Sequence, residues 1–116
     1  MPRYLLQAAY TPEAWAAQLK DPQNRIEIVS QLLQPLGGSF ETAYLAFGEY
    51  DIVAVMDVPD NVTAAAVSMV ISAGGSVKAI KTTPLMTIDE AVQAMRKGAT
   101  AASTYRPPAT PVFKVD

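Results

Sequence analysis

Two residue types that dominate enzyme active sites are missing, because the 116-residue chain contains no cysteine and no histidine. Disulfides, thiolate nucleophiles and thiolate metal sites are therefore excluded. The loss of histidine removes the commonest general base and the commonest metal ligand. A zinc site would have to be built from carboxylates alone, and histidine-ligated haem is impossible, although tyrosine ligation stays open. We expect no cofactor and no bound metal.

Long apolar runs and an excess of positive charge are missing as well. Charged residues or proline break every run well before the roughly 18 apolar residues that a membrane helix needs. Gln7 interrupts the short apolar stretch near the N-terminus, which therefore does not resemble a signal peptide. Nine Lys and Arg against eleven Asp and Glu give a formal charge of −2, which leaves no basic surface for nucleic acid. We expect a soluble, cytoplasmic protein with neither a membrane nor a nucleic-acid partner.

The sequence motifs of several large enzyme classes do not occur. The chain has no Gly-x-Ser-x-Gly elbow, no Walker loop, no Gly-x-Gly-x-x-Gly and no EF-hand pattern. Its serine and threonine hydroxyls have no histidine to activate them. An enzyme built on this chain would need a carboxylate or a tyrosine as its proton carrier.

Half of the residues are apolar and 17% are charged, a balance typical of a folded protein. The length suits a single domain with a hydrophobic core of its own. Periodicity and turn residues predict a mixture of strands and helices along the chain. We expect strands at about residues 3–10, 39–47, 50–58 and 76–83, and helices at about residues 12–20, 22–36, 62–74 and 87–98.

Short motifs mark where several of these elements begin or turn. Thr11-Pro12-Glu13 has a capping threonine, a proline at the first helical position and an acid in the first turn. Thr87 and Glu90 have the spacing of a capping box, which opens the last helix. Gly48-Glu49 fits a two-residue hairpin loop of type II′, with glycine first.

The order of the elements predicts an α+β fold, namely a ferredoxin-like βαββαβ sandwich with an extra C-terminal helix and tail. In that fold the helices cover one face of an antiparallel sheet, yet the strands at 3–10 and 50–58 are apolar on both faces. Monomers rarely expose an apolar face of that size. We therefore expect a homo-oligomer, a dimer or higher, in which two sheets pack together as a dimeric α+β barrel.

The composition changes at Ala99 to alanine, serine, threonine and proline, which is typical of a disordered tail. We accordingly divide the chain into a domain at residues 1–98 and a Pro/Ala/Thr-rich tail at residues 99–116. If the tail is ordered, its apolar side chains need a surface to pack on, and we expect that surface to be a neighbouring subunit. The side chains concerned are Tyr105, Val112, Phe113 and Val115.

Two segments of the chain resemble a known family. Residues 46–51, Ala-Phe-Gly-Glu-Tyr-Asp, run directly into Ile52-Val53, and residues 77–87 read Val-Lys-Ala-Ile-Lys-Thr-Thr-Pro-Leu-Met-Thr. With the early Pro-Arg-Tyr strand and the Gly-Gly-Ser-Phe-Glu entry to the second strand, they resemble the bacterial GYD-domain family. The family's defining residues would be Gly48, Tyr50 and Asp51 here.

The resemblance covers residues 2–97 and implies a ferredoxin-like fold within the dimeric α/β-barrel group. That group includes small monooxygenases, isomerases, haem-handling enzymes and amino-acid-sensing modules. The resemblance therefore implies little about activity, because the fold does not select among these functions.

Asp51 is the first candidate for a role in function. Its carboxylate suits a general base, or an orienting group in a cleft beside the sheet. Alternatively, the carboxylate accepts backbone N–H bonds and fixes the turn. Tyr50 alternates to the opposite strand face from Asp51, so the two side chains do not share one pocket.

Cationic and aromatic side chains supply the remaining candidates. Lys81 and Thr83 share one face of the fourth strand and suit an anionic ligand, or else the lysine protects an edge strand from unwanted pairing. Trp15, Tyr44 and Tyr50 suit an apolar ligand pocket, or else ordinary core or interface packing. The lone cations Arg3 and Arg25 are interpreted as solvated or ion-paired surface residues.

These residues support three hypotheses about function. The first is a homo-oligomeric small-molecule-binding protein, with Asp51 or Lys81 as a polar contact. The second is a cofactor-free small-barrel enzyme, monooxygenase- or isomerase-like, with Asp51 or a tyrosine as proton carrier. The third is a purely structural assembly protein in which the tail clasps a neighbouring subunit. The first hypothesis is favoured, and the sequence names no ligand or reaction.

Overall fold

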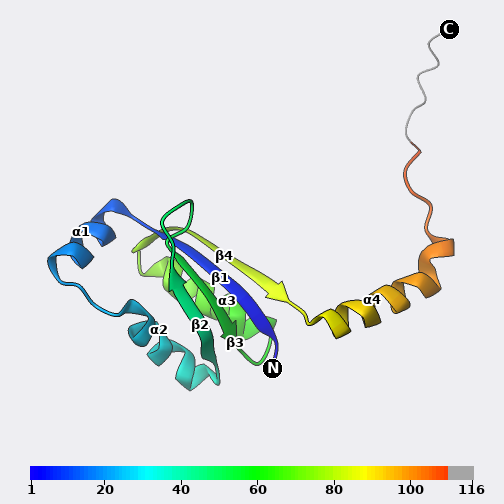
Figure 1. The fold of residues 1–116 in the computed structure, drawn as a ribbon, viewed down its shortest axis with the longest axis horizontal. Helices are drawn as coiled ribbons and strands as arrows, with labels where there is room; N and C mark the ends of the chain where they lie inside the picture. Colours follow the sequence, from blue (N-terminus) through cyan, green and yellow to red (C-terminus); the bar gives the residue numbers. More distant parts are fainter. Residues whose placement is uncertain (110–116) are drawn as a thin grey trace, which may run out of the picture. The chain divides into compact units, whose positions relative to one another are not determined.

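The computed structural model describes residues 1–109 of the chain (Figure 1). The chain divides into two units, Met1–Leu85 and Met86–Asp116. The first unit contains a sheet with three α-helices, and the second begins with one further helix. The first unit comprises β1 (Arg3–Tyr10), α1 (Pro12–Lys20), α2 (Arg25–Leu33), β2 (Ser39–Leu45), β3 (Ile52–Asp57), α3 (Asn61–Ala73) and β4 (Val77–Leu85).

The four strands form one antiparallel sheet in the order β2-β3-β1-β4. The strands β1 and β3 are internal, as their apolar residues on both faces predict, and β4 is an edge strand. Together with the helices, this sheet is the α+β, ferredoxin-like fold predicted from the element order.

A core of buried apolar side chains joins one face of the sheet to α2 and α3. Leu33 of α2, Met56 of β3 and Val67 of α3 are fully excluded from solvent. Burial of a side chain of this size stabilises a fold by about 1.5–3 kcal/mol. Polar groups at the same junction are paired, since the hydroxyls of Ser68 and Thr82 lie 2.6 Å apart. The helical face of the sheet is therefore well packed around its centre.

The first two helices begin at capping residues. Thr11 Oγ1 accepts a hydrogen bond from the Ala14 backbone N at 3.1 Å, and α1 has the predicted bounds. The second helix is shorter than the predicted 22–36, because Asn24 caps it and leaves residues 22–24 outside. At its other end, the segment Gln34–Leu36 tightens into a 3₁₀ turn. Pro35 has no N–H to donate to an α-helical hydrogen bond there.

The predicted type II′ hairpin at Gly48-Glu49 is wrong. A six-residue loop, 46–51, connects β2 to β3. The loop is closed by a hydrogen bond of 2.7 Å from the Ala46 backbone N to the Asp51 backbone carbonyl oxygen. A type II′ turn needs a positive φ at its first central residue, and Gly48 does not have one. Both strands are consequently shorter than the predicted 39–47 and 50–58.

The fourth strand continues beyond its predicted end at Thr83, through Pro84 to Leu85. Proline is tolerated in an edge strand, because its missing N–H removes no ladder bond when it faces outward. The expectation that Pro84 closes the strand is therefore corrected.

The second unit contains α4 (Ile88–Ala101), followed by a 3₁₀ turn at Ala102–Thr104. The predicted capping box is present, because Thr87 Oγ1 accepts from the Glu90 N at 3.1 Å and Glu90 Oε1 accepts from the Thr87 N at 3.0 Å. The helix passes through Gly98, where it was predicted to end, since one interior glycine costs only about 1 kcal/mol. In the tail, Val112, Phe113 and Val115 lie outside the described residues.

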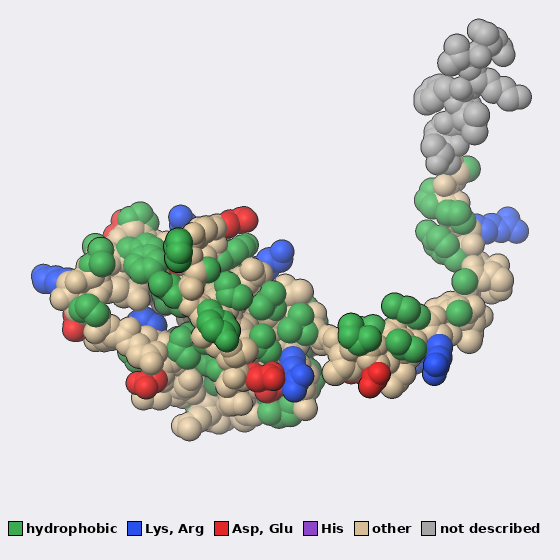
Figure 2. Space-filling model, viewed as in Figure 1, with side chains coloured by type: hydrophobic (Ala, Val, Ile, Leu, Met, Phe, Trp, Pro, Cys, Tyr) green, Lys and Arg blue, Asp and Glu red, His purple; other side chains and the backbone are tan. Residues whose placement is uncertain are grey.

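The sheet face opposite the core, which we call the open face, carries a mixed row of side chains. In register, Val53 pairs with Tyr44 on one side and Gln7 on the other, and Gln7 pairs with Lys81. Figure 2 shows hydrophobic side chains gathered over the sheet of the first unit. The next row pairs Leu5 with Val55, and both are only half-buried.

Arg3 lies at one end of the open face. Its Nε is 3.0 Å from Glu41 Oε2 and 3.4 Å from Asp57 Oδ1. The interpretation of Arg3 as an ion-paired surface cation is confirmed.

None of the helices within residues 1–109 is long and apolar enough to cross a membrane.

Candidate functional site

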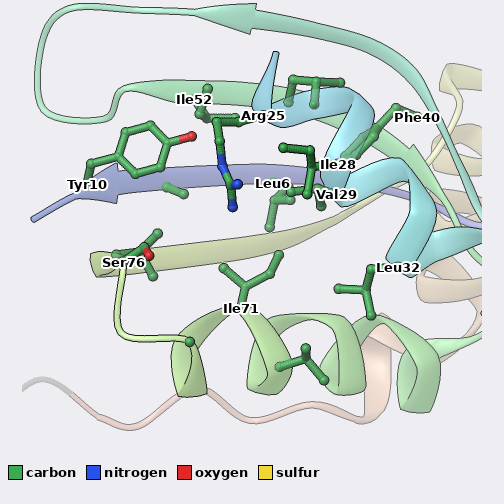
Figure 3. A pocket seen from close by; sticks show the side chains of 15 residues that line it. Leu6, Tyr10, Arg25, Ile28, Val29, Leu32, Phe40, Ile52, Ile71 and Ser76 are labelled. Atoms are coloured by element: carbon green, nitrogen blue, oxygen red, sulfur yellow. The ribbon is translucent and has the colours of Figure 1, made fainter. Parts of the chain in front are cut away.

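A cavity of about 240 Å³ lies between the helical face of the sheet and the helices α2 and α3 (Figure 3). Apolar residues alternate along β1 and recur at helical spacing in α2, so both elements turn side chains toward this space. The wall is therefore mostly hydrocarbon. Its apolar side chains include Leu6, Val29, Leu32, Phe40, Ile52 and Ile71.

Three polar residues line the cavity: Tyr10 at the end of β1, Arg25 at the start of α2 and Ser76 just before β4. In Figure 3 the Tyr10 hydroxyl and the Arg25 guanidinium point into the space between α2 and the sheet. The same three residues also line an adjoining hollow of about 320 Å³, together with Gln18 and Asp21. They therefore stand at the boundary between an apolar cavity and a more polar hollow beside α1.

Tyr10 is held in place by two neighbours. Its ring contacts Trp15 of α1 edge to face, with the ring centroids 5.3 Å apart at 77°. Its backbone N donates to Asp51 Oδ2 at 2.8 Å. The carboxylate supplies this acceptor where β3 no longer pairs with β1, so the backbone donor is satisfied. Contacts outside the cavity thus fix the position of Tyr10.

The electrostatics of this end of the cavity favour hydrogen-bond donation. Burial raises the pKa of the Tyr10 hydroxyl above its ordinary 10.0, the nearby Arg25 guanidinium opposes that rise by charge and hydrogen bonding, and Asp51 adds to it. The hydroxyl is therefore protonated at neutral pH. Within residues 1–109, Arg25 forms no ion pair with a carboxylate. A tyrosine O–H and an arginine side chain without a carboxylate partner lie together.

The structure brings two of the six predicted site residues to the edge of this site. Asp51 and Trp15 both contact Tyr10, although neither lines the cavity itself. The structural alternative for Asp51, in which its carboxylate accepts a backbone N–H near a turn, is what the geometry displays. The carboxylate is therefore connected to the cavity only through the backbone of Tyr10.

The other four predicted residues lie elsewhere in the first unit. Lys81 and Thr83 of β4 and Tyr44 of β2 belong to the open face, on the far side of the sheet from the cavity. Tyr50 is half-buried in the 46–51 loop. Their role as ligand contacts stays a prediction that concerns a different surface.

The sequence interpretation treated Arg25 as a solvated or ion-paired surface residue. In the structure Arg25 is half-buried, lines the cavity and carries no ion pair within residues 1–109. One signal could have found it. A cation in the first turn of a helix opposes the helix dipole, so an arginine at the start of α2 does not serve helix stability.

The described part of the chain holds no cluster of three or more acidic side chains that could hold a metal ion. Fold and cavity together define a small ferredoxin-like α+β domain with an apolar cavity between its sheet and its helices. The model of the GYD domain family matches residues 4–95. The chain belongs to the GYD domain family. No curated protein and no solved structure matches it.

Proposed function

We propose that this GYD-domain protein is a homo-oligomer that binds a small molecule in the cavity between its sheet and helices α2 and α3. The observation that carries the proposal is the cavity of about 240 Å³, with its apolar wall and its polar end at Tyr10 and Arg25. Small-molecule sites commonly combine an apolar wall with a few polar groups that orient the ligand.

The cavity is large enough for a small molecule and is partly open to solvent, since Ile28 and Val70 of its wall are 39% and 52% exposed. At about 30 Å³ per water, the cavity has room for roughly eight waters. Water would find hydrogen-bonding partners only at the polar end, so the apolar wall favours an organic occupant.

A binding role fits the contacts of Asp51 better than the enzyme alternative does. A proton carrier must reach its substrate, yet one oxygen of Asp51 accepts from the Tyr10 backbone and its side chain does not line the cavity. Tyr10 does line the cavity, but its raised pKa makes it a poor base at neutral pH. A monooxygenase- or isomerase-like enzyme therefore stays the second candidate.

The open face supports the oligomeric part of the proposal. Leu5, Val53 and Val55 lie at its centre and are only half-buried, while Tyr44 is 71% exposed. A second copy packed sheet to sheet would cover this apolar surface, as in a dimeric α+β barrel. We extend the proposal to the tail at residues 99–116, whose Tyr105 is exposed and would pack on the neighbouring subunit.

Calorimetric titration of the full chain with octanol, a neutral and largely apolar probe, tests the binding proposal. Val29 lines the cavity, so Val29→Phe fills part of the space and is expected to weaken octanol binding by ~10-fold or more. Val62 on α3 is 79% exposed and does not line the cavity, so Val62→Phe is the matched control.

Binding to the wild type and to Val62→Phe, with loss in Val29→Phe, supports the proposal. Absence of octanol binding to the wild type, or equal binding by all three proteins, overturns it. Thermal melts of the three proteins identify any loss that comes from unfolding.

A further inference from the structure

We infer that the natural ligand of the cavity is a small apolar carboxylate, whose carboxylate binds the Arg25 guanidinium and the Tyr10 hydroxyl while its hydrocarbon part fills the cavity. The inference rests on the proposed binding function and adds the chemical class of the ligand. Its basis is the placement of one cation and one neutral donor together at the end of an apolar space.

Arg25 provides the charge that selects an anion. It is the only charged residue among those that line the cavity, and no described carboxylate forms an ion pair with it. Its half-buried guanidinium offers five N–H donors in a planar fork that matches a carboxylate, and hydrogen bonding to the Tyr10 hydroxyl uses only part of them. A neutral ligand would leave that charge without a counterion.

The electrostatic setting of Arg25 points in the same direction. As the first residue of α2, Arg25 stands at the positive end of the helix dipole, where a cation is disfavoured and an anion is favoured. Asp21 borders the neighbouring hollow, but its Oδ2 accepts from Gln23 Nε2 at 2.9 Å and no ion pair joins it to Arg25. A bound carboxylate would satisfy both the guanidinium and the helix end.

Tyr10 adds a second donor with a defined direction. Its ring is fixed by Trp15 and its backbone by Asp51, so the hydroxyl has little freedom to turn away. A protonated phenol beside a guanidinium gives a carboxylate two different partners, one for each oxygen. Asp51 and Trp15 are in this account positioning residues that act through Tyr10.

The remaining space determines the body of the ligand. A volume of about 240 Å³ holds an apolar group on the order of ten non-hydrogen atoms. Aliphatic side chains and one phenylalanine form most of the wall, which suits a hydrocarbon chain or a small ring. Octanoate, with eight carbons and one carboxylate, is a suitable probe.

The test compares octanoate with octanol by calorimetry at neutral pH, using the ratio of the two affinities as the readout. Because hydrogen bonds to a charged group contribute about 1.5–3 kcal/mol, the wild type is expected to prefer octanoate by ~10-fold or more. In Arg25→Met that ratio is expected to fall to about one. Arg3→Met removes another cation of the first unit, one that does not line the cavity, and is expected to keep the wild-type ratio.

An octanoate-to-octanol affinity ratio near one in the wild type, or an unchanged ratio in Arg25→Met, overturns the inference. If octanol still binds in that case, the proposed function stands. If neither probe binds the wild type, the proposed function fails as well. Arg25→Gln provides a second neutral variant in case Arg25→Met does not fold.

Discussion

At the scale of single residues, Asp51, the aspartate of the GYD segment, contacts the backbone of Tyr10 and does not line the cavity. Asp51 holds the backbone of Tyr10, and Tyr10 in turn lines the cavity beside Arg25. The sequence left two alternatives open for Asp51, because a carboxylate after a turn is equally suited to a backbone acceptor and to a proton carrier. Choosing between these two roles requires knowing that the Tyr10 backbone N, 41 residues away in the sequence, lies within hydrogen-bonding distance of Asp51.

Substitution of Asp51 distinguishes a positioning role from a proton-carrying one. Asp51→Ala leaves the Tyr10 N–H without its acceptor and is expected to destabilise the fold by about 1–2 kcal/mol. Asp51→Asn keeps a side-chain oxygen that can accept and is expected to retain most of the stability. Urea unfolding of the three proteins measures both effects. A stability loss in Asp51→Asn as large as in Asp51→Ala would contradict the acceptor role.

At the scale of elements, the strands and helices were predictable because each carries its own local signal. A short run that is apolar on both faces predicted β1 within its observed bounds, and Thr11 with Pro12 predicted the start of α1. The β2–β3 loop was not predictable, because Gly48 is compatible with a tight turn but does not require one. The cavity was beyond prediction too, since it depends on how far α2 and α3 stand from the sheet.

Gly38 and Gly48 differ in whether the surrounding structure has room for a Cβ atom. A Cβ on Gly38 would lie 2.7 Å from Val58 Cγ1 and 2.8 Å from the Asp57 carbonyl oxygen. Because one of these atoms belongs to the backbone, Gly38→Ala would force the backbone near Asp57 or Gly38 to move. We expect a loss of about 1–3 kcal/mol in the free energy of unfolding. A Cβ on Gly48 meets nothing within 4 Å, and Gly48→Ala is expected to be nearly neutral. Chemical denaturation tests both, and an equal loss in the two variants would refute this reasoning.

The N-terminus of α3 is expected to respond to acid. Hydrogen bonds from the Thr63 backbone N and hydroxyl, at 2.8 and 2.7 Å, hold the pKa of Asp60 below its ordinary 3.8. Because the folded-state pKa is the lower one, the stabilisation is present above the ordinary value and is lost as pH falls through the folded-state pKa. Asp60→Asn should remove this part of the pH dependence. Urea midpoints of both proteins between neutral pH and pH 2 measure it, and identical acid profiles would contradict the assignment.

At the scale of the whole molecule, the open face and the cavity divide the sheet between two roles. Side chains that point away from the helices form the apolar centre of the open face, and those that point toward the helices form the core and one wall of the cavity. The sequence predicted this alternation in β1 and β3 and, from it, an oligomer. It did not predict that Lys81 and Tyr44 would lie on the face opposite the cavity.

Assembly through the open face is expected to fail when a charge is placed at its centre. Val55 pairs in register with Leu5 and is half-buried, so Val55→Lys would bury an unpaired ammonium between two sheets. Light scattering is expected to give a multiple of the 12.4 kDa subunit for the wild type and one subunit for the variant. Val62→Lys, at an exposed position of α3, is the control. An unchanged mass in Val55→Lys would exclude the open face as the interface.

The central claim is that a small apolar carboxylate binds in the cavity beneath α2 and α3, and methyl chemical shifts during a titration with octanoate test it most directly. The account predicts shift changes at Leu6, Val29 and Ile71, which line the cavity. It predicts none of comparable size at Leu5, Val53 and Val55 on the open face. Changes confined to the open-face methyls, or no saturable change at the cavity methyls, would contradict it.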